Sequence, residues 1–305
     1  MTNEKTNLQK RIESGGPILL AEYSPPLGGQ PSVVRETAQR YAGKVHALGV
    51  SENRGRVGMS ALAAASLVLA EGVEPILHVI TRDRNRIALV SDYLGARALG
   101  IHNVLCTTGT HQTLGNFRAA KNVFDIDSTQ LLQAYAGLAA DASLVGESGI
   151  NGFDPACLGA VTCSHADPAE LQMMRLAKKV AAGAQFIITQ PIFDVERFDA
   201  WFEQVTAGGI HEKVALLAGI QVLTDADQAK SLAESRPDPK IPEATLSRIV
   251  SAGDKAAQRT AGIEVAVETI QKLSAAKGLR GFEICGDGDD EAVLEVIEKS
   301  GLGSA

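Results

Sequence analysis

Eight short apolar runs, separated by amphipathic stretches, constrain the fold of this chain more than any other feature. The runs are apolar throughout instead of alternating with polar residues, which is typical of parallel strands that are covered on both faces. Several of the stretches between them have helical periodicity and end in glycine, a common helix terminator. The apolar runs lie at residues 18–23, 45–51, 75–81, 103–108, 157–163, 185–191, 214–220 and 281–286, and the clearest helical stretches at 60–72, 85–100, 168–183 and 194–209.

This alternation predicts an α/β fold, a (β/α)8 TIM barrel formed by residues 1–305 as a single domain. Residues 1–14 are expected to form a polar N-terminal extension or helix. The segment 236–254 is expected to add a loop and an extra helix before the last repeat. An open, doubly wound sheet is the alternative, although no G-x-G-x-x-G motif follows the first run, as a dinucleotide-binding domain of that class would require.

Composition excludes several functional classes. The chain has 45% hydrophobic residues and a net charge of −7 without a basic stripe, so we expect neither nucleic-acid binding nor a membrane surface. No apolar segment is long enough to span a membrane, and no secretory signal is evident, which predicts a cytoplasmic protein. The four cysteines form no C-x-x-C pair, so they are expected to be reduced, buried and structural, with no metal site.

Polar residues follow the predicted strands at their carboxyl ends. Glu22 ends the run "ILLAEY" and is followed by two prolines, and Gln190 ends "QFIITQP". In a (β/α)8 barrel these ends share one face, where the active sites of such enzymes lie. We therefore interpret Glu22 as a functional carboxylate, with a glutamate at the water-exposed end of a strand as the alternative.

Several segments together resemble the methylenetetrahydrofolate reductase family, in particular its short bacterial, acetogen-type branch. The similarity extends over roughly residues 10–285, nearly the whole chain. Its most specific part is "AGAQFIITQPIFD". The segments that carry the resemblance are "AEYSPP", "LHVITRDRNR", "NVLCTTGTHQ", "AKKVAAGAQFIITQPIFDVERF" and "AGIQVLTDADQAK".

The resemblance implies a flavin-dependent oxidoreductase of one-carbon metabolism. Such an enzyme interconverts 5,10-methylenetetrahydrofolate and 5-methyltetrahydrofolate by hydride transfer with FAD. Glu22 matches the family's acid, which protonates N10 of the folate, and we expect burial to raise its pKa for that purpose. Gln190 matches a glutamine that binds the substrate, and Thr110 falls at a further substrate position.

The resemblance also implies a set of FAD-binding residues. Some of these residues have an alternative without a ligand: His78 as a core histidine, Arg82 in surface salt bridges, and Lys178 and Lys179 as solvated lysines of a helix. Gly109 would allow a flat ligand to approach the backbone closely. The expected cofactor-binding residues are His78, Arg82, Thr108, Gly109, His111, Lys178 and Lys179.

Two departures from the family pattern leave other functions open. Thr110 stands where the family has an aspartate that helps to stabilise the iminium cation, and Ala226 where it has a phenylalanine that stacks on folate. The alternatives are a flavin- or folate-binding barrel subunit that is active only within a larger complex, and a flavin-free relative. Electrons would come from NAD(P)H or from a partner electron-transfer subunit, and a hetero- or homo-oligomer is possible.

Overall fold

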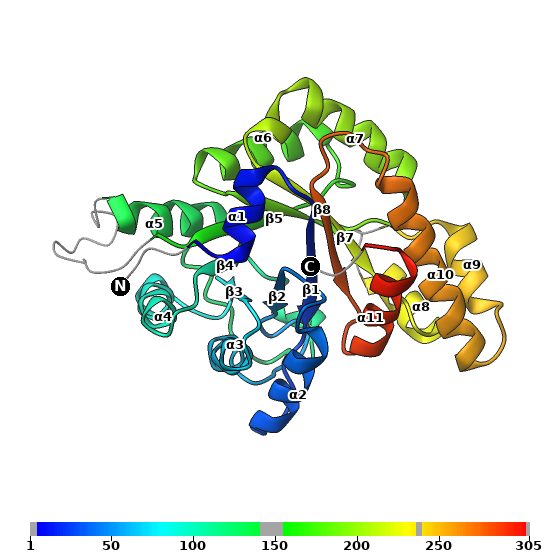
Figure 1. Ribbon diagram of the computed structural model, residues 1–305, viewed down its shortest axis with the longest axis horizontal. Coiled ribbons are helices and arrows are strands. Elements are labelled where there is room, and N and C mark those ends of the chain that lie inside the picture. The colour runs from blue at the N-terminus through cyan, green and yellow to red at the C-terminus, as the bar shows by residue number, and fades with distance from the viewer. Residues whose placement is uncertain (1–4, 141–154, 236–239, 303–305) are drawn as a thin grey trace.

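Eight parallel strands close into a barrel in chain order, each hydrogen-bonded to the next and β8 to β1 (Figure 1). The computed structural model describes residues 5–140, 155–235 and 240–302. The predicted (β/α)8 barrel is therefore confirmed, and the alternative of an open sheet is wrong. The strands are β1 Ile18–Tyr23, β2 Ala47–Val50, β3 Pro75–Ile80, β4 Asn103–Thr107, β5 Cys157–Thr162, β6 Phe186–Pro191, β7 Ala215–Gln221 and β8 Gly281–Cys285.

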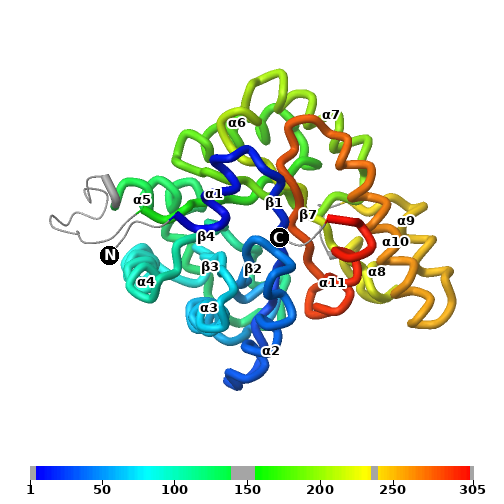
Figure 2. Tube along the Cα trace, viewed as in Figure 1, coloured from blue at the N-terminus to red at the C-terminus, as the bar shows by residue number. Residues whose placement is uncertain are grey.

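Helices follow the strands and surround the barrel, as the tube in Figure 2 shows. All four helical stretches expected from the sequence are present, each shorter than its apolar pattern by a few residues. The helices are α1 Asn7–Ser14, α2 Pro31–Tyr41, α3 Ala61–Ala70, α4 Arg86–Ala98, α5 Ser128–Ala140, α6 Ala169–Ala181, α7 Val195–Ala207, α8 Ala226–Ser235, α9 Glu243–Val250, α10 Lys255–Leu273 and α11 Asp290–Lys299, with short 3-10 turns η1 Gln112–Leu114 and η3 Ile210–Glu212.

The extra helix predicted within 236–254 is α9, so β7 and β8 are connected through α8, α9 and α10. Residues 236–239 of that segment lie outside the described residues. Leu223, Phe193 and Ile249 form a small apolar cluster beneath α8 and α9. This cluster anchors the insertion to the barrel without adding a strand.

The N-terminal half of the barrel interior is filled with apolar side chains. Leu8 of α1 joins this interior cluster, which also contains Ile18, Leu20, Ile76, Leu105, Phe186 and Leu217. Helix α1 is held at this end because Thr6 Oγ1 donates to Asn103 Oδ1 at 3.0 Å, at the start of β4. The predicted N-terminal helix therefore closes one end of the barrel, which leaves the opposite end for a ligand.

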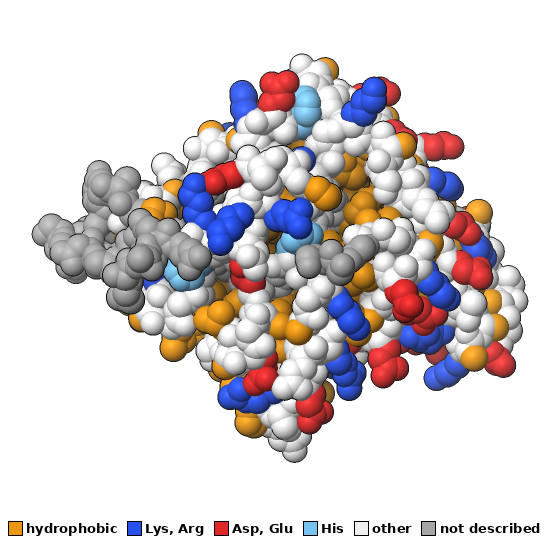
Figure 3. Space-filling view, in the orientation of Figure 1, with side chains coloured by type: hydrophobic (Ala, Val, Ile, Leu, Met, Phe, Trp, Pro, Cys, Tyr) orange, Lys and Arg blue, Asp and Glu red, His pale blue; other side chains and the backbone are white. Residues whose placement is uncertain are grey.

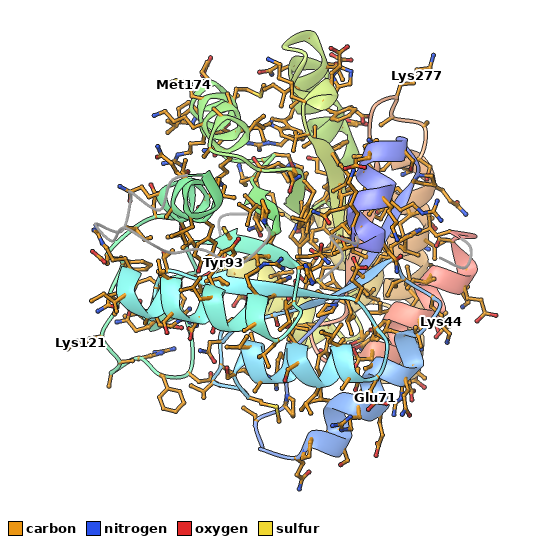
Figure 4. All side chains as sticks on the ribbon, turned by 60° about the vertical axis from the view of Figure 1, so that its left-hand side comes forward. Lys44, Glu71, Tyr93, Lys121, Met174 and Lys277 are labelled. Atoms are coloured by element: carbon orange, nitrogen blue, oxygen red, sulfur yellow. The ribbon has the colours of Figure 1, made fainter. Side chains whose placement is uncertain are left out.

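The larger part of the core lies between the barrel and its helices. Tyr93 of α4, labelled in Figure 4, stacks on Tyr135 of α5 with ring centroids 4.2 Å apart, whereas Lys44, Glu71 and Lys277 lie at the periphery. Acidic and basic side chains are interspersed on the face drawn in Figure 3. Within the described ranges, no helix has both the length and the apolar character needed to cross a bilayer.

Candidate active site

A cavity of about 860 Å³ opens at the carboxyl ends of the barrel strands. All eight strands, or the loops that follow them, contribute to its lining, as Glu22, Ser51, His78, Thr107, Thr162, Gln190, Gly219 and Glu283 illustrate. Its volume is in the range of cavities that hold cofactors and drug-sized ligands. The polar residues expected at the strand ends thus face one common space.

Glu22 lies at the end of β1 and forms an ion pair with Arg54. The Arg54 guanidinium donates from Nη1 to Glu22 Oε1 at 2.7 Å, and the Glu22 side chain is only 9% exposed. Arg54 follows β2 in the segment "SENRG", 32 residues from its partner. The chain therefore brings a buried carboxylate and a guanidinium together at the cavity.

The ion pair overturns the expected raised pKa of Glu22. Burial alone would raise the pKa of this carboxyl, but the charge of Arg54 and hydrogen bonds from Arg54 and Ser51 outweigh it. The pKa of Glu22 is therefore lowered, and the residue is an anion at neutral pH. The sequence suggested that desolvation would raise the pKa of Glu22, but it gave no indication that Arg54 would lower it.

A second carboxyl, Glu283 of β8, lines the same cavity. It lies in register with Gly219 of β7 and Leu20 of β1, and its side chain is buried with 7% exposure of the residue. Its Oε1 atom has no hydrogen-bond partner. Burial, reinforced by the nearby charge of Glu22 and opposed by Arg54, raises the pKa of Glu283 to about 8.

His78 of β3 completes this polar group, which we call the floor cluster: Glu22, Arg54, His78 and Glu283. A Cβ on Gly49 of β2 would lie 2.7 Å from His78 Nε2, so the imidazole occupies space that only a glycine leaves open. His78 Nε2 has no hydrogen-bond partner. Burial lowers the pKa of His78, and the charge of Arg54 lowers it further, although the charge of Glu22 acts in the opposite direction. The lowered pKa favours the neutral imidazole.

Gln190 lies within β6 at an irregularity of the strand. The register between β6 and β7 shifts between Ile188 and Pro191, and Gln190 lines the cavity. A Cβ on Gly219 would lie 2.3 Å from the Thr189 carbonyl oxygen, so β7 approaches the bulge only because it has a glycine there. Bulges of this kind re-aim side chains next to active sites. Asp194, and not Gln190, caps the helix α7 that follows this strand.

One wall of the cavity is basic and comes from α6. Arg175, Lys178 and Lys179 line it. Lys179 Nζ donates to the Val161 carbonyl oxygen at 2.5 Å, and burial lowers the pKa of its ammonium group. Met174, on the same helix, is 57% exposed and is labelled in Figure 4. The donor chemistry of this wall suits an anionic ligand group such as a diphosphate.

Arg82 connects three loops and is buried, and it forms a salt bridge with Asp83, as the alternative expected. Its guanidinium donates to Asp83, to the Thr110 carbonyl oxygen at 2.9 Å and to the Asn53 carbonyl oxygen at 3.2 Å. Thr108 Oγ1 accepts from the Ser128 backbone N–H at 3.1 Å. Arg82, Thr108 and Thr110 line the cavity. The hydrogen bonds named here join protein groups to one another, so they fix the shape of the cavity rim.

Gly109 and His111, in the loop after β4, both have structural roles within that region. Gly109 has φ +85°, and a Cβ there would lie 2.4 Å from Ile80 Cγ2, so packing against β3 by itself requires glycine. His111 does not line the cavity. Its ring caps η1 by accepting from the Thr113 backbone N–H and lies near Phe124. His111 is therefore apart from the other predicted cofactor-binding residues.

The cysteines differ partly from the prediction. None of the four forms a disulfide, and Cys106 and Cys157 are buried as expected, but Cys163 is partly exposed. Cys163 and Cys285 line the cavity, and Cys285 Sγ lies 3.7 Å from Arg54 Nη1. Among the described residues, no group of three or more metal-ligating side chains is present.

Sequence reasoning missed Arg54 and Glu283. Arg54 has no distinguishing local pattern, because its partner is distant in the chain. Glu283 carries the signal that identified Glu22, an acid within an apolar strand. The run "GFEICG" was interpreted only as a core strand, although a glutamate inside it is costly to bury without a reason.

Comparison with solved structures shows a shared fold. A structure described as "Uncharacterized protein from Clostridium thermocellum binds two copies of 5-methyl-5,6,7,8-tetrahydrofolic acid" matches with a TM-score of 0.68 and 11% identity, over 97% of this chain and 100% of that one. A riboflavin lyase solved with modified FMN and riboflavin matches with a TM-score of 0.56 and 9% identity, over 93% of this chain and 90% of that one.

Comparison with known sequences is more specific. Methylenetetrahydrofolate reductase 1 of Schizosaccharomyces pombe is 31% identical over 137 residues, which are 45% of this chain and only 22% of the yeast protein. The family model for methylenetetrahydrofolate reductase matches residues 7–301. Because that match spans almost the whole barrel, the chain belongs to the methylenetetrahydrofolate reductase family of oxidoreductases.

Proposed function

We propose that this chain interconverts 5,10-methylenetetrahydrofolate and 5-methyltetrahydrofolate with FAD as its cofactor. The observation that carries the proposal is the cavity at the carboxyl ends of the strands, where Glu22 and Gln190 face a common space in a member of this family. Gln190 offers an amide donor and acceptor to the edge of a pterin. The solved neighbour that binds 5-methyltetrahydrofolate is consistent with this substrate class.

The residues present suit FAD. The basic wall of α6, formed by Arg175, Lys178 and Lys179, would hold the diphosphate, and the cavity has room for a ring system beside it. Arg82, Thr108 and Gly109 fix the rim near β4, and His78 lines the floor with its unpartnered Nε2 buried against Gly49. When bound, FAD supplies the hydride for reduction of the methylene carbon or accepts it in the reverse direction.

The work of the protein is to open the folate ring and to stabilise the charge that results. The methylene carbon is bridged between N5 and N10, and the N10 bond breaks once N10 is protonated. The proton must come from an acid in the cavity, and the floor cluster holds two carboxyls, Glu22 and Glu283. The closed apolar end of the barrel keeps water away from the lower side of this cluster.

The test is an anaerobic assay on the purified protein. We expect FAD to bind stoichiometrically and give a yellow protein, and 5-methyltetrahydrofolate to reduce the flavin. Protein that stays colourless after incubation with FAD would contradict the cofactor. Yellow protein whose flavin is bleached by dithionite but not by 5-methyltetrahydrofolate would contradict the reaction.

Two observations favour a second candidate, a folate- or flavin-binding barrel that turns over only within a larger complex. Glu22 is already paired with Arg54, and Thr110 brings no charge to the rim. This candidate predicts binding of 5-methyltetrahydrofolate without flavin reduction by the isolated chain. Whether NAD(P)H or a partner subunit provides the electrons, and whether the chain forms oligomers, stay predictions.

A further inference from the structure

The two carboxyls of the floor cluster have different surroundings. Glu22 is held by Arg54 at 2.7 Å, and Glu283 leaves Oε1 without a partner although the residue is only 7% exposed. By strand register, the β8 partner of Glu22 is Cys285, two residues beyond Glu283, so Glu283 lies deeper in the barrel. The groups that face the pair are Arg54, His78 and the Cys285 thiol.

The charges of the floor cluster allow one anion. Arg54 is the cation of the cluster, and it is paired with Glu22. His78 is buried with an unpartnered Nε2 and favours its neutral form, so it adds no second cation. A second carboxylate in the same low-dielectric space would repel Glu22 without compensation. The cluster therefore accommodates Glu22 as the anion and Glu283 as the neutral acid.

We propose that Glu283, and not Glu22, delivers the proton to N10 of the bound folate, while Glu22, fixed by Arg54, stabilises the cation that ring opening creates. This inference rests on the proposed function and assigns the roles within it. Pairs of acids whose environments separate their protonation commonly divide the acid and anion roles in this way. The raised pKa of Glu283, about 8, and the lowered pKa of Glu22 are consistent with the division.

The step balances as follows. The O–H bond of Glu283 breaks as an N10–H bond forms, and the bond between N10 and the methylene carbon breaks with its electron pair left on N10. The positive charge moves to the N5 iminium, where the Glu22 carboxylate faces it. Reduced FAD, when bound, would supply the hydride that converts the methylene carbon to a methyl group, and would itself be oxidised. In the reverse direction Glu283, as a carboxylate, recovers the proton from N10.

The division also accounts for the rim residue Thr110. The family places an aspartate there to stabilise the iminium, and threonine supplies no charge. With the proton on Glu283, Glu22 is already a carboxylate, paired with Arg54, when that charge forms. A single carboxyl at Glu22 would become an anion only as it gave up its proton, whereas the division provides the anion before the ring opens.

The activity test compares Glu283→Gln with Glu283→Asp. For Glu283→Gln we expect kcat for methylenetetrahydrofolate reduction to fall by about 100- to 10,000-fold, with the Kd for 5-methyltetrahydrofolate and flavin reduction by dithionite unchanged. The wild-type rate should fall as pH rises through about 8, and this limb should disappear in the glutamine variant. Glu283→Asp keeps an acid and should recover part of the rate. Wild-type turnover by Glu283→Gln would overturn the proposal.

A second measurement requires neither turnover nor cofactor. Infrared spectra of the wild-type protein near neutral pH should contain the carbonyl stretch of a protonated, buried carboxyl, which disappears as pH rises through about 8. Glu283→Gln should lack this band, and Glu22→Gln should lose it too, because Arg54 then becomes available to pair with Glu283. A band that persists in Glu283→Gln would overturn the assignment, whether or not the protein reduces folate.

Glu52→Gln is the matched control for the infrared assignment. Glu52 also lines the cavity, and burial raises its pKa to about 7, but its carboxylate accepts from the Ile80 backbone N–H and pairs with Arg84. Its substitution should leave the Glu283 band in place. Loss of the band in Glu52→Gln but not in Glu283→Gln would show that Glu52 carries the proton, and would overturn the proposal.

Discussion

The two ends of the barrel interior are built by the same strands for opposite purposes. Toward the N-terminal end, Ile18, Leu20, Phe186 and Leu217 form one apolar cluster with Leu8 of α1. Toward the carboxyl ends of the strands, the floor cluster holds two carboxyls, a guanidinium and an imidazole from β1, β3, β8 and the loop after β2, with unpartnered atoms on His78 and Glu283. One end stabilises the fold, and the other holds charges that are costly to bury and that a ligand can use.

The first way to test this comparison is to remove packing at each end. Phe186→Ala should lower the free energy of unfolding by about 3–5 kcal/mol, because the ring fills the space that Gly159 leaves open, where a Cβ would lie 2.2 Å from Phe186 Cζ. Val161→Ala, at the partly exposed wall of the cavity, should cost only about 1 kcal/mol. Denaturant unfolding of both variants checks this. Equal losses would mean that the two ends do not differ in how they stabilise the protein.

The second test uses the pH dependence of stability. The pKa of Glu283 rises from 4.5 to about 8 on folding, so the folded state binds an extra proton between these values. Stability from this group is present at low pH and is lost as pH rises through about 8. Relative to wild type, Glu283→Gln should therefore become more stable as the pH increases from about 5 to about 9. Melting temperatures across this range measure the difference, and a constant difference would contradict the raised pKa.

The third and smallest effect concerns the cavity rim. If FAD binds as proposed, Thr110→Asp places an anion near the flavin and should lower its midpoint potential. At an assumed separation of about 5 Å and an effective dielectric of about 20, the interaction is roughly 3 kcal/mol, which corresponds to on the order of 60 mV for a two-electron couple. Thr110 is exposed, so solvent should reduce the shift below that value.

Thr113→Asp is the control for the rim variant, because Thr113 belongs to η1 and does not line the cavity. It should leave the potential nearly unchanged. A potential that rises in Thr110→Asp, or that shifts equally in both variants, would show that residue 110 does not tune the flavin.

The stabilising end of the barrel was predictable from sequence, and the charged end only in part. All eight strands appeared as apolar runs, with ends within about two residues of those observed, because strands buried on both faces leave a continuous local signal. Glu22 and Gln190 were predicted from their place at strand ends and from the family resemblance, and both line the cavity. His111 was predicted on the same basis and instead caps η1.

The remainder of the site depends on contacts between distant segments. Arg54 reverses the expected pKa shift of Glu22 from a loop 32 residues away, and a single sequence gives no means of pairing the two. Gly49 leaves room for His78 only because β2 and β3 are adjacent in the barrel. Glu283 was detectable, because a glutamate within an apolar strand is the same signal as Glu22, but without a known partner its protonation was not.

The measurement that tests the central claim most directly is anaerobic bleaching of the flavin by 5-methyltetrahydrofolate in wild type and Glu22→Gln. If the floor cluster is the reaction site, the substrate should bleach the bound FAD of the wild type, and Glu22→Gln should do so about 100- to 10,000-fold more slowly while dithionite reduces both at the same rate. Bleaching at the wild-type rate in Glu22→Gln would contradict the claim that the charged end of the barrel carries the chemistry.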